Sequence, residues 1–171
     1  MESQLIWNEL YHKFCIELKK DFSDQNIPAW LSHFKPNATI KVYQYGKDAT
    51  GKSGKGKNIN VYTGSWVSSL IAFKIPAKLM AKSLFRRLRK QDYSRSDIHL
   101  LGIHSTENHV TAHIRFERFN TSGKKYHIAH GLYNLEKSDA LWHITEMRVY
   151  DNEDDLKKNM IYSSLWHPQT D

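Results

Sequence analysis

The chain has 171 residues, a formal net charge of +7 and a sequence pI of about 9.4. A chain of this length is expected to form one domain that buries roughly two-thirds of its unfolded surface. It holds no run of about 18 apolar residues, which excludes a membrane-spanning helix, and its first residues lack the basic start of a signal peptide. Its one cysteine, Cys15, excludes an internal disulfide and a cysteine cluster for zinc. We therefore expect a cytoplasmic protein.

The first part of the chain predicts two helices that cover a sheet. Between residues 4 and 20, apolar residues fall near one side of a helix and charged residues fall mostly on the other. Cys15 lies in this helix, and we expect it to pack as a small apolar residue. Pro28 fits the first turn of a short second helix over 27–34. The apolar side of the first helix consists of Leu5, Leu10, Phe14 and Leu18.

A predicted strand and a glycine-rich loop follow. Thr39–Tyr45 is rich in β-branched and aromatic residues, which predicts a strand. Residues 46–58 hold four glycines and four lysines, and this composition is typical of an exposed loop. Residues 46–53 match the GxxxxGK[ST] pattern of phosphate-binding loops. In such loops the last two residues open a helix, whereas Gly54–Lys57 disfavours one here. We therefore expect no nucleotide binding.

The segment from Ala77 to Gln91 predicts an amphipathic helix with a strongly basic side. Between Lys41 and Arg95 there are thirteen basic residues and two acidic ones, so the rest of the chain is net negative. A basic side is most often solvated surface, and attraction to an acidic partner is the alternative. No recognition motif for nucleic acid accompanies it. The apolar positions are Ala77, Met80, Ala81, Leu84 and Leu88, and the basic positions are Lys78, Lys82, Arg86, Arg89 and Lys90.

Residues 107–151 form the strongest structural pattern in the chain. From Val110 to Phe116 apolar and polar residues alternate, which is the period of a half-buried strand, and the next two segments repeat this alternation. Residues 120–123 and 136–140 supply the two turns between the strands. We therefore predict a meander of three antiparallel strands, preceded by a further strand around His99–His104. The helices must cover its apolar face, which indicates an α+β fold.

Three stretches of the chain carry a family resemblance. They are the passage 29–42 with its Phe34-x-Pro36-Asn37-Ala38-Thr39-Ile40 run, the hairpin FERFNTSGKKY, and Tyr133-x-Leu135 followed by Trp142-x-Ile144. Together they resemble the nuclear transport factor 2-like superfamily, of the SnoaL-like and ketosteroid isomerase-like kind. The resemblance implies a curved antiparallel sheet wrapped around the N-terminal and middle helices into a cone, a pocket at the wide end, and commonly a homodimer. It implies one domain over 1–151 and a C-terminal extension over 152–171.

The family's chemistry does not carry over to this sequence. Ketosteroid isomerase-like members use a tyrosine and two aspartates, one of them protonated, whereas the best-matching positions here hold Ile16, Val42 and Gly131. None of these side chains can transfer a proton. We predict no specific reaction, and the resemblance implies an isomerase, dehydratase or hydrolase if the protein is an enzyme. The ten histidines show no spacing diagnostic of zinc, so we expect no metal and no cofactor.

Two functions remain open from the sequence. The first is a pocket protein that binds a small, largely apolar ligand. The second is a non-catalytic dimeric binding module that presents its basic face to an acidic partner, without specific nucleic-acid recognition. The homodimer would use the alternate face of the meander, with Thr111, His113, Arg115, His143 and Thr145. The candidate pocket residues are Val42, Trp66, Ala112, Ile114, Phe116, Ala129, Gly131, Tyr133 and Met147.

Overall fold

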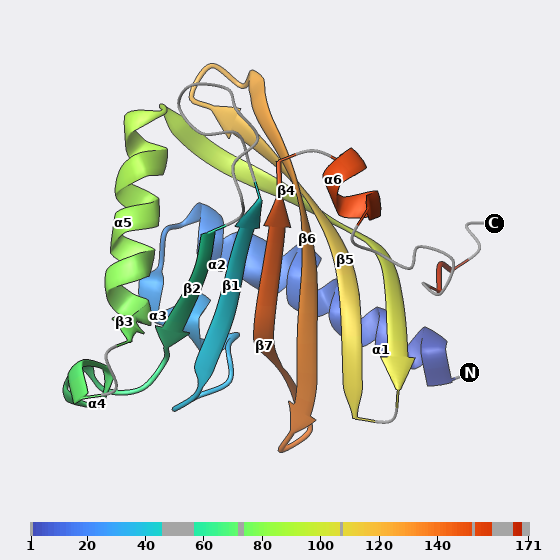
Figure 1. Cartoon of the computed structure of the whole chain (residues 1–171). Coiled ribbons are helices and arrows are strands. Elements are labelled where there is room, and N and C mark those ends of the chain that lie inside the picture. The colour runs from blue at the N-terminus through green and yellow to red at the C-terminus, as the bar shows by residue number, and fades with distance from the viewer. Residues whose placement is uncertain are drawn as a thin grey trace.

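One curved sheet organises the computed structural model, which describes residues 2–45, 57–71, 74–106, 108–151, 153–158 and 166–168. Within these residues seven strands follow the order β3-β2-β1-β7-β6-β5-β4 (Figure 1). The strands are β1 Thr39–Tyr45, β2 Lys57–Tyr62, β3 Ile75–Pro76, β4 Tyr93–Thr106, β5 His109–Asn120, β6 Lys125–Ser138 and β7 Leu141–Tyr150. The match to the phosphate-loop pattern lies outside the described residues, so its rejection stays a prediction.

The helices lie on both sides of the sheet. The long N-terminal segment crosses behind the strands in Figure 1, α5 flanks the β1–β3 end, and α6 lies in front of the strands. This arrangement confirms the predicted α+β class and the predicted first, second and middle helices, with ends shifted by a few residues. The helical elements are α1 Glu2–Tyr11, the π-helix η1 His12–Leu18, α2 Lys19–Ser23, α3 Ile27–Ser32, α4 Trp66–Ile71, α5 Ala77–Lys90 and α6 Glu153–Lys158.

The sheet is mixed, although most of its pairs are antiparallel. Strands β5 to β7 form the predicted three-stranded meander and β4 is the further strand predicted before it, with β5 pairing β4 and β6 and β6 pairing β7 in antiparallel register. Strand β1 pairs β2 in antiparallel register but runs parallel to β7, with Val42 opposite Met147. Strand β3 runs parallel to β2. The sequence pattern identified β1 as a strand but did not identify its partner, because β7 lies about 100 residues further along the chain.

The N-terminal helix buries a different side chain from the one predicted near its start. Leu10, Phe14 and Leu18 are buried as predicted, and so is Cys15, whereas Leu5 is 60% exposed. Ile6 is buried in its place, so the buried side repeats every four residues from Ile6 to Phe22. In an α-helix a spacing of four drifts around the axis by about 40° per step. The wider π-helical turns of η1 counter this drift and keep the buried side against the sheet.

The hydrophobic core fills the concave side of the sheet beneath the N-terminal helix. Ala112, Ile114 and Ile144 are fully buried there together with Leu10 and Phe14. On the convex side a smaller apolar cluster joins Leu156 of α6 to Leu132 and Tyr150. The concave side therefore holds the main core, and α6 covers part of the opposite face.

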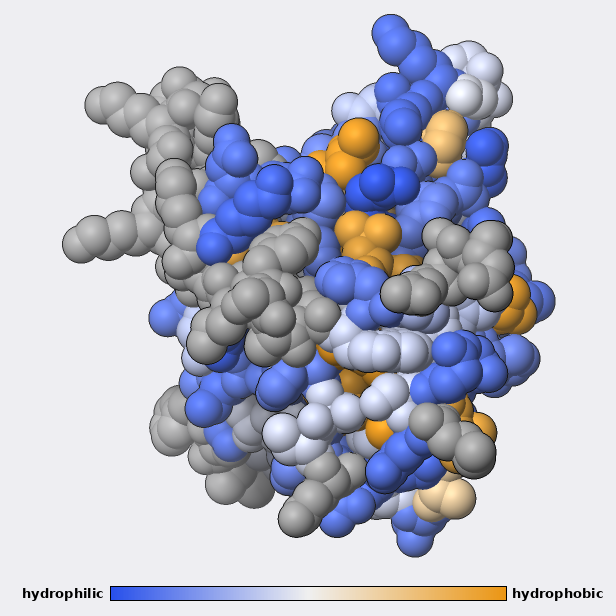
Figure 2. Space-filling model, turned by 90° about the vertical axis from the view of Figure 1, so that its right-hand side faces the viewer, coloured by the Kyte–Doolittle hydropathy of each residue, from blue (hydrophilic) through white to orange (hydrophobic). Residues whose placement is uncertain are grey.

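Residues near the C-terminus contact the edge strand β4. Trp166 and Ile103 exchange backbone hydrogen bonds, and the Trp166 ring packs edge-on against Trp7 with ring centroids 5.5 Å apart. Figure 2 views the side at the right of Figure 1 and shows a mostly hydrophilic described surface with small separate apolar areas. No helix among the described residues is long and apolar enough to cross a membrane. The division at residue 151 into domain and extension stays a prediction.

Candidate ligand cavity

A cavity of about 140 Å³ lies between the helices and the concave face of the sheet. Most of its lining side chains are apolar, and the polar exceptions are Arg87, Arg118 and Tyr133. The helical side contributes Leu18, Phe22, Trp30, Phe34, Met80, Leu84 and Arg87. The strands contribute Val42, Ile59, Phe116, Arg118, Ala129, Tyr133, Met147 and Val149.

Aromatic rings form the wall of the cavity nearest the core. The Phe22 ring packs edge-on against Trp30, with ring centroids 5.8 Å apart, and Trp30 packs edge-on against Phe34 at 5.2 Å. Phe85 of α5 contacts Phe22 and Trp30 from behind, with centroids 5.2 and 5.6 Å apart. Edge-to-face packing of buried rings fixes their orientation. This wall is therefore preformed.

Small residues on β6 leave the space that the cavity occupies. Ala129 lies opposite Phe116 in the β5–β6 register, and Gly131 follows it on the same face. A Cβ atom on Gly131 would lie 2.4 Å from Cε2 of Tyr133, so only glycine lets the Tyr133 ring lie over the backbone there. In the next row of the sheet, Tyr133 is opposite Met147. The small side chain of Ala129 thus leaves part of the space that the cavity occupies.

Arg118 is the most unusual residue of the lining. It lies two residues after Phe116 on β5, is half-buried, and takes part in no ion pair or side-chain hydrogen bond among the described residues. Its Nε atom is buried without a hydrogen-bond partner. Burial lowers the pKa of the guanidinium, and the nearby phenol of Tyr126 opposes that shift. A guanidinium nevertheless stays charged at neutral pH.

The polar groups around Arg118 come from a bulge in the β5–β6 hairpin. Arg118 pairs with His127, and the register then shifts so that Phe119 pairs with Lys125. Such a bulge changes the direction of the side chains beside it. The His127 Nδ1 atom and the Tyr126 hydroxyl oxygen are buried without hydrogen-bond partners in the described part of the chain, while His127 Nε2 lies 3.7 Å from Asp151 Oδ1. Burial lowers the pKa of His127, and the charge of Arg118 lowers it further.

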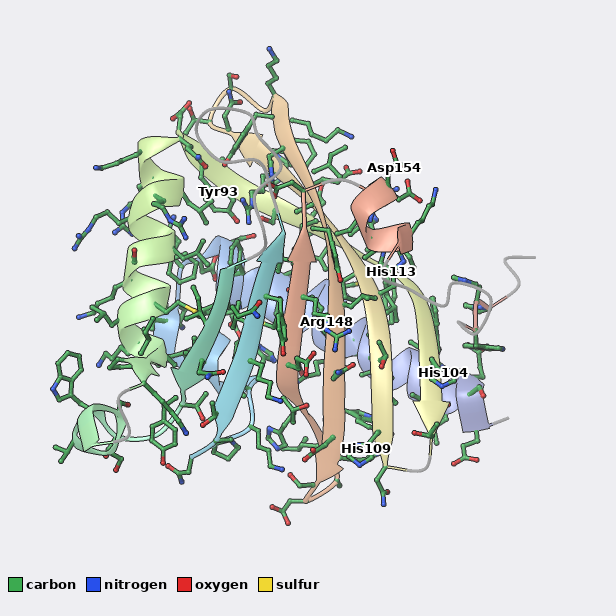
Figure 3. The ribbon with its side chains drawn as sticks, viewed as in Figure 1. Tyr93, His104, His109, His113, Arg148 and Asp154 are labelled. Atoms are coloured by element: carbon green, nitrogen blue, oxygen red, sulfur yellow. The ribbon has the colours of Figure 1, made fainter. Side chains whose placement is uncertain are left out.

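A second polar group lies behind the cavity lining, near Phe22 and Arg118. Tyr93, labelled in Figure 3 where β4 begins beside the end of α5, has its hydroxyl 2.9 Å from Ser96 Oγ. The Ser96 backbone N–H donates to Ser23 Oγ at 3.2 Å, which ties β4 to α2. Burial raises the pKa of Tyr93. Tyr93, Ser96 and Ser23 are therefore linked by hydrogen bonds, whereas Arg118 Nε has no such partner among the described residues.

The cavity lining can bind and orient a ligand more readily than it can transfer protons. No aspartate, glutamate or histidine lines it among the described residues. Burial raises the pKa of Tyr133, which keeps its phenol neutral and able to donate a hydrogen bond. Neither Tyr133 nor Arg118 is a general base at neutral pH. No grouping of three or more metal-ligating side chains occurs in the part of the chain that the structure describes.

The structure separates the nine candidate pocket residues into two sets. Four of the nine do not line the cavity: Trp66 is 55% exposed on α4, Ala112 and Ile114 are fully buried in the core, and Gly131 lies under the Tyr133 ring. Their participation in ligand binding stays a prediction. The cavity brings together Val42, Phe116, Ala129, Tyr133 and Met147.

Sequence reasoning missed Arg118 and the helical side of the cavity. Arg118 continues the alternation of Ala112, Ile114 and Phe116 on β5, and this period of two was sufficient to place it on the concave face. The helical side could not be found in this way, because the approach of Trp30 and Met80 to the sheet depends on tertiary packing. The predicted exposure of the basic side of α5 is confirmed.

The convex face carries charged and polar groups that contact one another. His113 Nε2 and His130 Nδ1 lie 3.2 Å apart in a buried pair, and Figure 3 shows His113 beside α6. Arg115 Nε lies 3.4 Å from Glu117 Oε1. Burial and the neighbouring His130 lower the pKa of His113 to about 4. The proposed use of this face in a homodimer stays a prediction.

Comparison with known proteins gives structural but not sequence relatives. No protein-family model matches the chain, and no curated protein matches it in sequence. An NTF-2-like protein of unknown function from Shewanella oneidensis MR-1 aligns with a TM-score of 0.56 and 11% identity, over 88% of this chain and 100% of that one. A domain of unknown function with a cystatin-like fold from Nostoc punctiforme PCC 73102 aligns with a TM-score of 0.57 and 8% identity, over 95% of this chain and 91% of that one.

A third likeness leads to the same fold. A protein of unknown function from Mycobacterium tuberculosis aligns with a TM-score of 0.56 and 11% identity, over 94% of this chain and 80% of that one. At these identities the likeness concerns the fold and carries no activity across. It agrees with the curved sheet, the covering helices and the order of the elements described above. The chain therefore shares the cystatin-like, NTF2-like fold of these structures, which is the fold that the sequence resemblance implied, whereas its membership of the nuclear transport factor 2-like superfamily stays a prediction.

Proposed function

We propose that this protein binds a small, largely apolar ligand in the cavity on the concave face of its sheet. The observation that carries the proposal is an apolar cavity of about 140 Å³ beneath a preformed aromatic wall. An apolar cavity of about 150 Å³ stays dry and takes up a molecule the size of benzene. The ligand would therefore be about the size of one six-membered ring with a short substituent.

The proposal is for binding, with no reaction assigned. The three positions that match the acid and base residues of ketosteroid isomerase-like proteins lack proton-transfer groups, and Ile16 is also 50% exposed on the far side of its helix. Val42 lines the cavity as an apolar residue, and Gly131 has no side chain. A ligand here would meet apolar walls and two or three hydrogen-bond donors.

A titration with benzyl alcohol, followed by the methyl NMR signals of the protein, tests this proposal. We expect shifts concentrated at Val42, Ala129 and Met147, and saturable binding. Ala129 is buried at the cavity wall, so Ala129→Leu should fill the space and weaken binding by about tenfold or more. Val67→Leu, at a position 64% exposed on α4, is the control and should bind like the wild type. Shifts scattered over the surface, or binding unchanged in Ala129→Leu, would contradict the proposal.

A second function, an interaction with an acidic partner, has one observation in its favour. Lys78, Lys82 and Arg86 are exposed on one helix, and no ion pair among the described residues includes them. Charge alone predicts weak, sequence-independent binding to polyanions, with a slope of about −0.9 in log affinity against log salt for each phosphate of duplex DNA. Titrations with unrelated oligonucleotides at low and physiological salt test this. Tight, sequence-selective binding at physiological salt would favour this second function over the cavity.

A further inference from the structure

The charge of Arg118 has no ion-pair partner among the residues that the structure describes. Among the described residues Asp151 is the one carboxylate that affects its pKa, and that carboxylate lies 3.7 Å from His127 Nε2 and forms no ion pair with Arg118. The other groups that act on Arg118 are the phenols of Tyr93, Tyr126 and Tyr133. Neutral phenols do not balance a positive charge. Because an unbalanced charge in an apolar site is costly, an opposite charge supplied by a bound molecule would be strongly favoured there.

The shape of the guanidinium restricts the chemistry of that molecule. Arg118 presents a planar fork of N–H donors, which matches the two oxygens of a carboxylate in a bidentate contact. One guanidinium balances one negative charge, and the rest of the lining is apolar apart from Tyr133 and the exposed Arg87. A phosphate would bring a second charge and more acceptors than these groups can satisfy. A monocarboxylate fits the donors that are present.

The position of Arg118 sets the orientation of the ligand. Figure 1 shows that the β5–β6 hairpin and the C-terminal end of α5 lie at the same end of the sheet, so both arginines of the lining come from this end. The aromatic wall of Phe22, Trp30 and Phe34 borders the rest of the cavity. A ligand with an acidic group at one end and an apolar body at the other would satisfy both parts.

We infer that the ligand is a small apolar monocarboxylate whose carboxylate binds Arg118 and whose ring or short chain fills the apolar part of the cavity. This inference rests on the proposed function and names the class of ligand for the same cavity. Arg87 is exposed at the margin of the cavity, where water screens its charge, so its contribution is smaller. Arg118 is the residue that selects the acid over its neutral analogues.

Calorimetric titrations with benzoate and benzamide, and with hexanoate and hexanamide, test the inference. Each pair has the same shape and differs in charge. For the wild type we expect the carboxylate to bind about tenfold or more tightly than the amide. Arg118→Met should weaken carboxylate binding by about tenfold to a hundredfold and leave amide binding within about threefold. The control is Arg86→Met, which removes the same charge from an exposed position of α5 outside the cavity.

The outcomes separate this inference from the proposed function. If acid and amide bind equally to the wild type, and Arg118→Met changes neither, the cavity binds ligands but the inference is wrong. If no probe binds at the cavity, the proposed function fails and the inference fails with it. Arg118→Lys keeps the charge without the planar fork, and it should bind the acids with intermediate affinity. Wild-type affinity in both folded Arg118 variants would also overturn the inference.

Discussion

Strand β5 carries an arginine on each face of the sheet, and the two arginines have different surroundings. On the convex face, Arg115 contacts Glu117, whose carboxylate also lies 3.3 Å from Lys125 Nζ. On the concave face, Arg118 lines an apolar cavity and has no ion-pair partner among the described residues. On this strand Arg115 therefore has a carboxylate beside it, whereas the charge of Arg118 lies against apolar packing with no such partner among the described residues. That contrast is the physical basis for placing a ligand on the concave face.

The first prediction sharpens the contrast within the concave face, between its filled part and its cavity. Ile114 is fully buried in the core, whereas Ile59 lines the cavity. Ile114→Ala should lower the free energy of unfolding by about 2–5 kcal/mol, because the change creates a new void. Ile59→Ala should lower it by roughly 1 kcal/mol, because its side chain already borders open space. Urea unfolding followed by circular dichroism measures both, and equal losses would show that the cavity region is packed as tightly as the core.

The second prediction concerns the convex face and depends on pH. The pKa of His113 is about 4 in the folded protein and about 6.5 in the unfolded chain. Between these values the unfolded state binds more protons, so stability falls as the pH falls from 6.5 towards 4 and is fully present above 6.5. His113 forms a buried pair with His130 and lies near Glu153, Arg115 and His167. Its low pKa should therefore make the protein roughly 3 kcal/mol less stable at pH 4 than above pH 6.5.

Comparison of variants isolates this effect from general acid unfolding. His113→Gln should flatten the pH dependence of the unfolding free energy between pH 6.5 and 4 relative to the wild type. His109→Gln is the matched control, because His109 lies on the same strand with its side chain 67% exposed. A pH dependence that is the same in all three proteins would mean that His113 is already protonated in the folded state or has an ordinary pKa there.

Local patterns in the sequence predicted the strands and their faces, whereas features set by contacts between distant segments could not be predicted. Alternation along β5 identified the strand and its two faces, and the turns at residues 121–124 and 139–140 agree with the predicted breaks. The prediction that Leu5 lies on the buried side of the first helix was wrong, and Ile6 is buried there instead. The prediction assumed a regular α-helix, whereas the π-helical turns after Tyr11 change the angle around the axis between Leu10 and the apolar residues that follow. The sequence pattern also could not show that β1 lies beside β7. That pairing is set by contacts between distant segments.

The candidate site was predicted only on its strand side. Val42, Phe116 and Met147 were found because strands with one buried face place alternate residues on it. Trp66 belongs to α4 and is largely exposed, and a sequence pattern cannot tell an exposed apolar helix residue from one that turns inward. Whether a side chain lines a cavity or fills the core depends on how closely the opposite element approaches. The fully buried Ile114 and the cavity-lining Phe116, two residues apart on one strand, illustrate this limit.

The last prediction tests the two arginines of β5 directly through stability. Arg115→Met should lower the free energy of unfolding by up to about 1 kcal/mol, because it leaves Glu117 with one fewer partner. Arg118→Met should leave it unchanged or raise it by roughly 1 kcal/mol, because methionine suits an apolar site better than an unpaired charge does. Thermal and urea unfolding of both variants without added ligand provide the measurement.

If Arg115→Met lowers the free energy of unfolding and Arg118→Met raises it, the protein retains Arg118 at a cost to its own stability. Residues that bind ligands commonly carry such a cost, because their interactions are completed only in the complex. Added benzoate should then stabilise the wild type more than Arg118→Met, because the ligand binds the folded state and supplies the missing charge. If Arg118→Met is instead destabilised as much as Arg115→Met, the guanidinium already has sufficient partners within the chain. The difference between the two faces of β5 would then be one of packing alone.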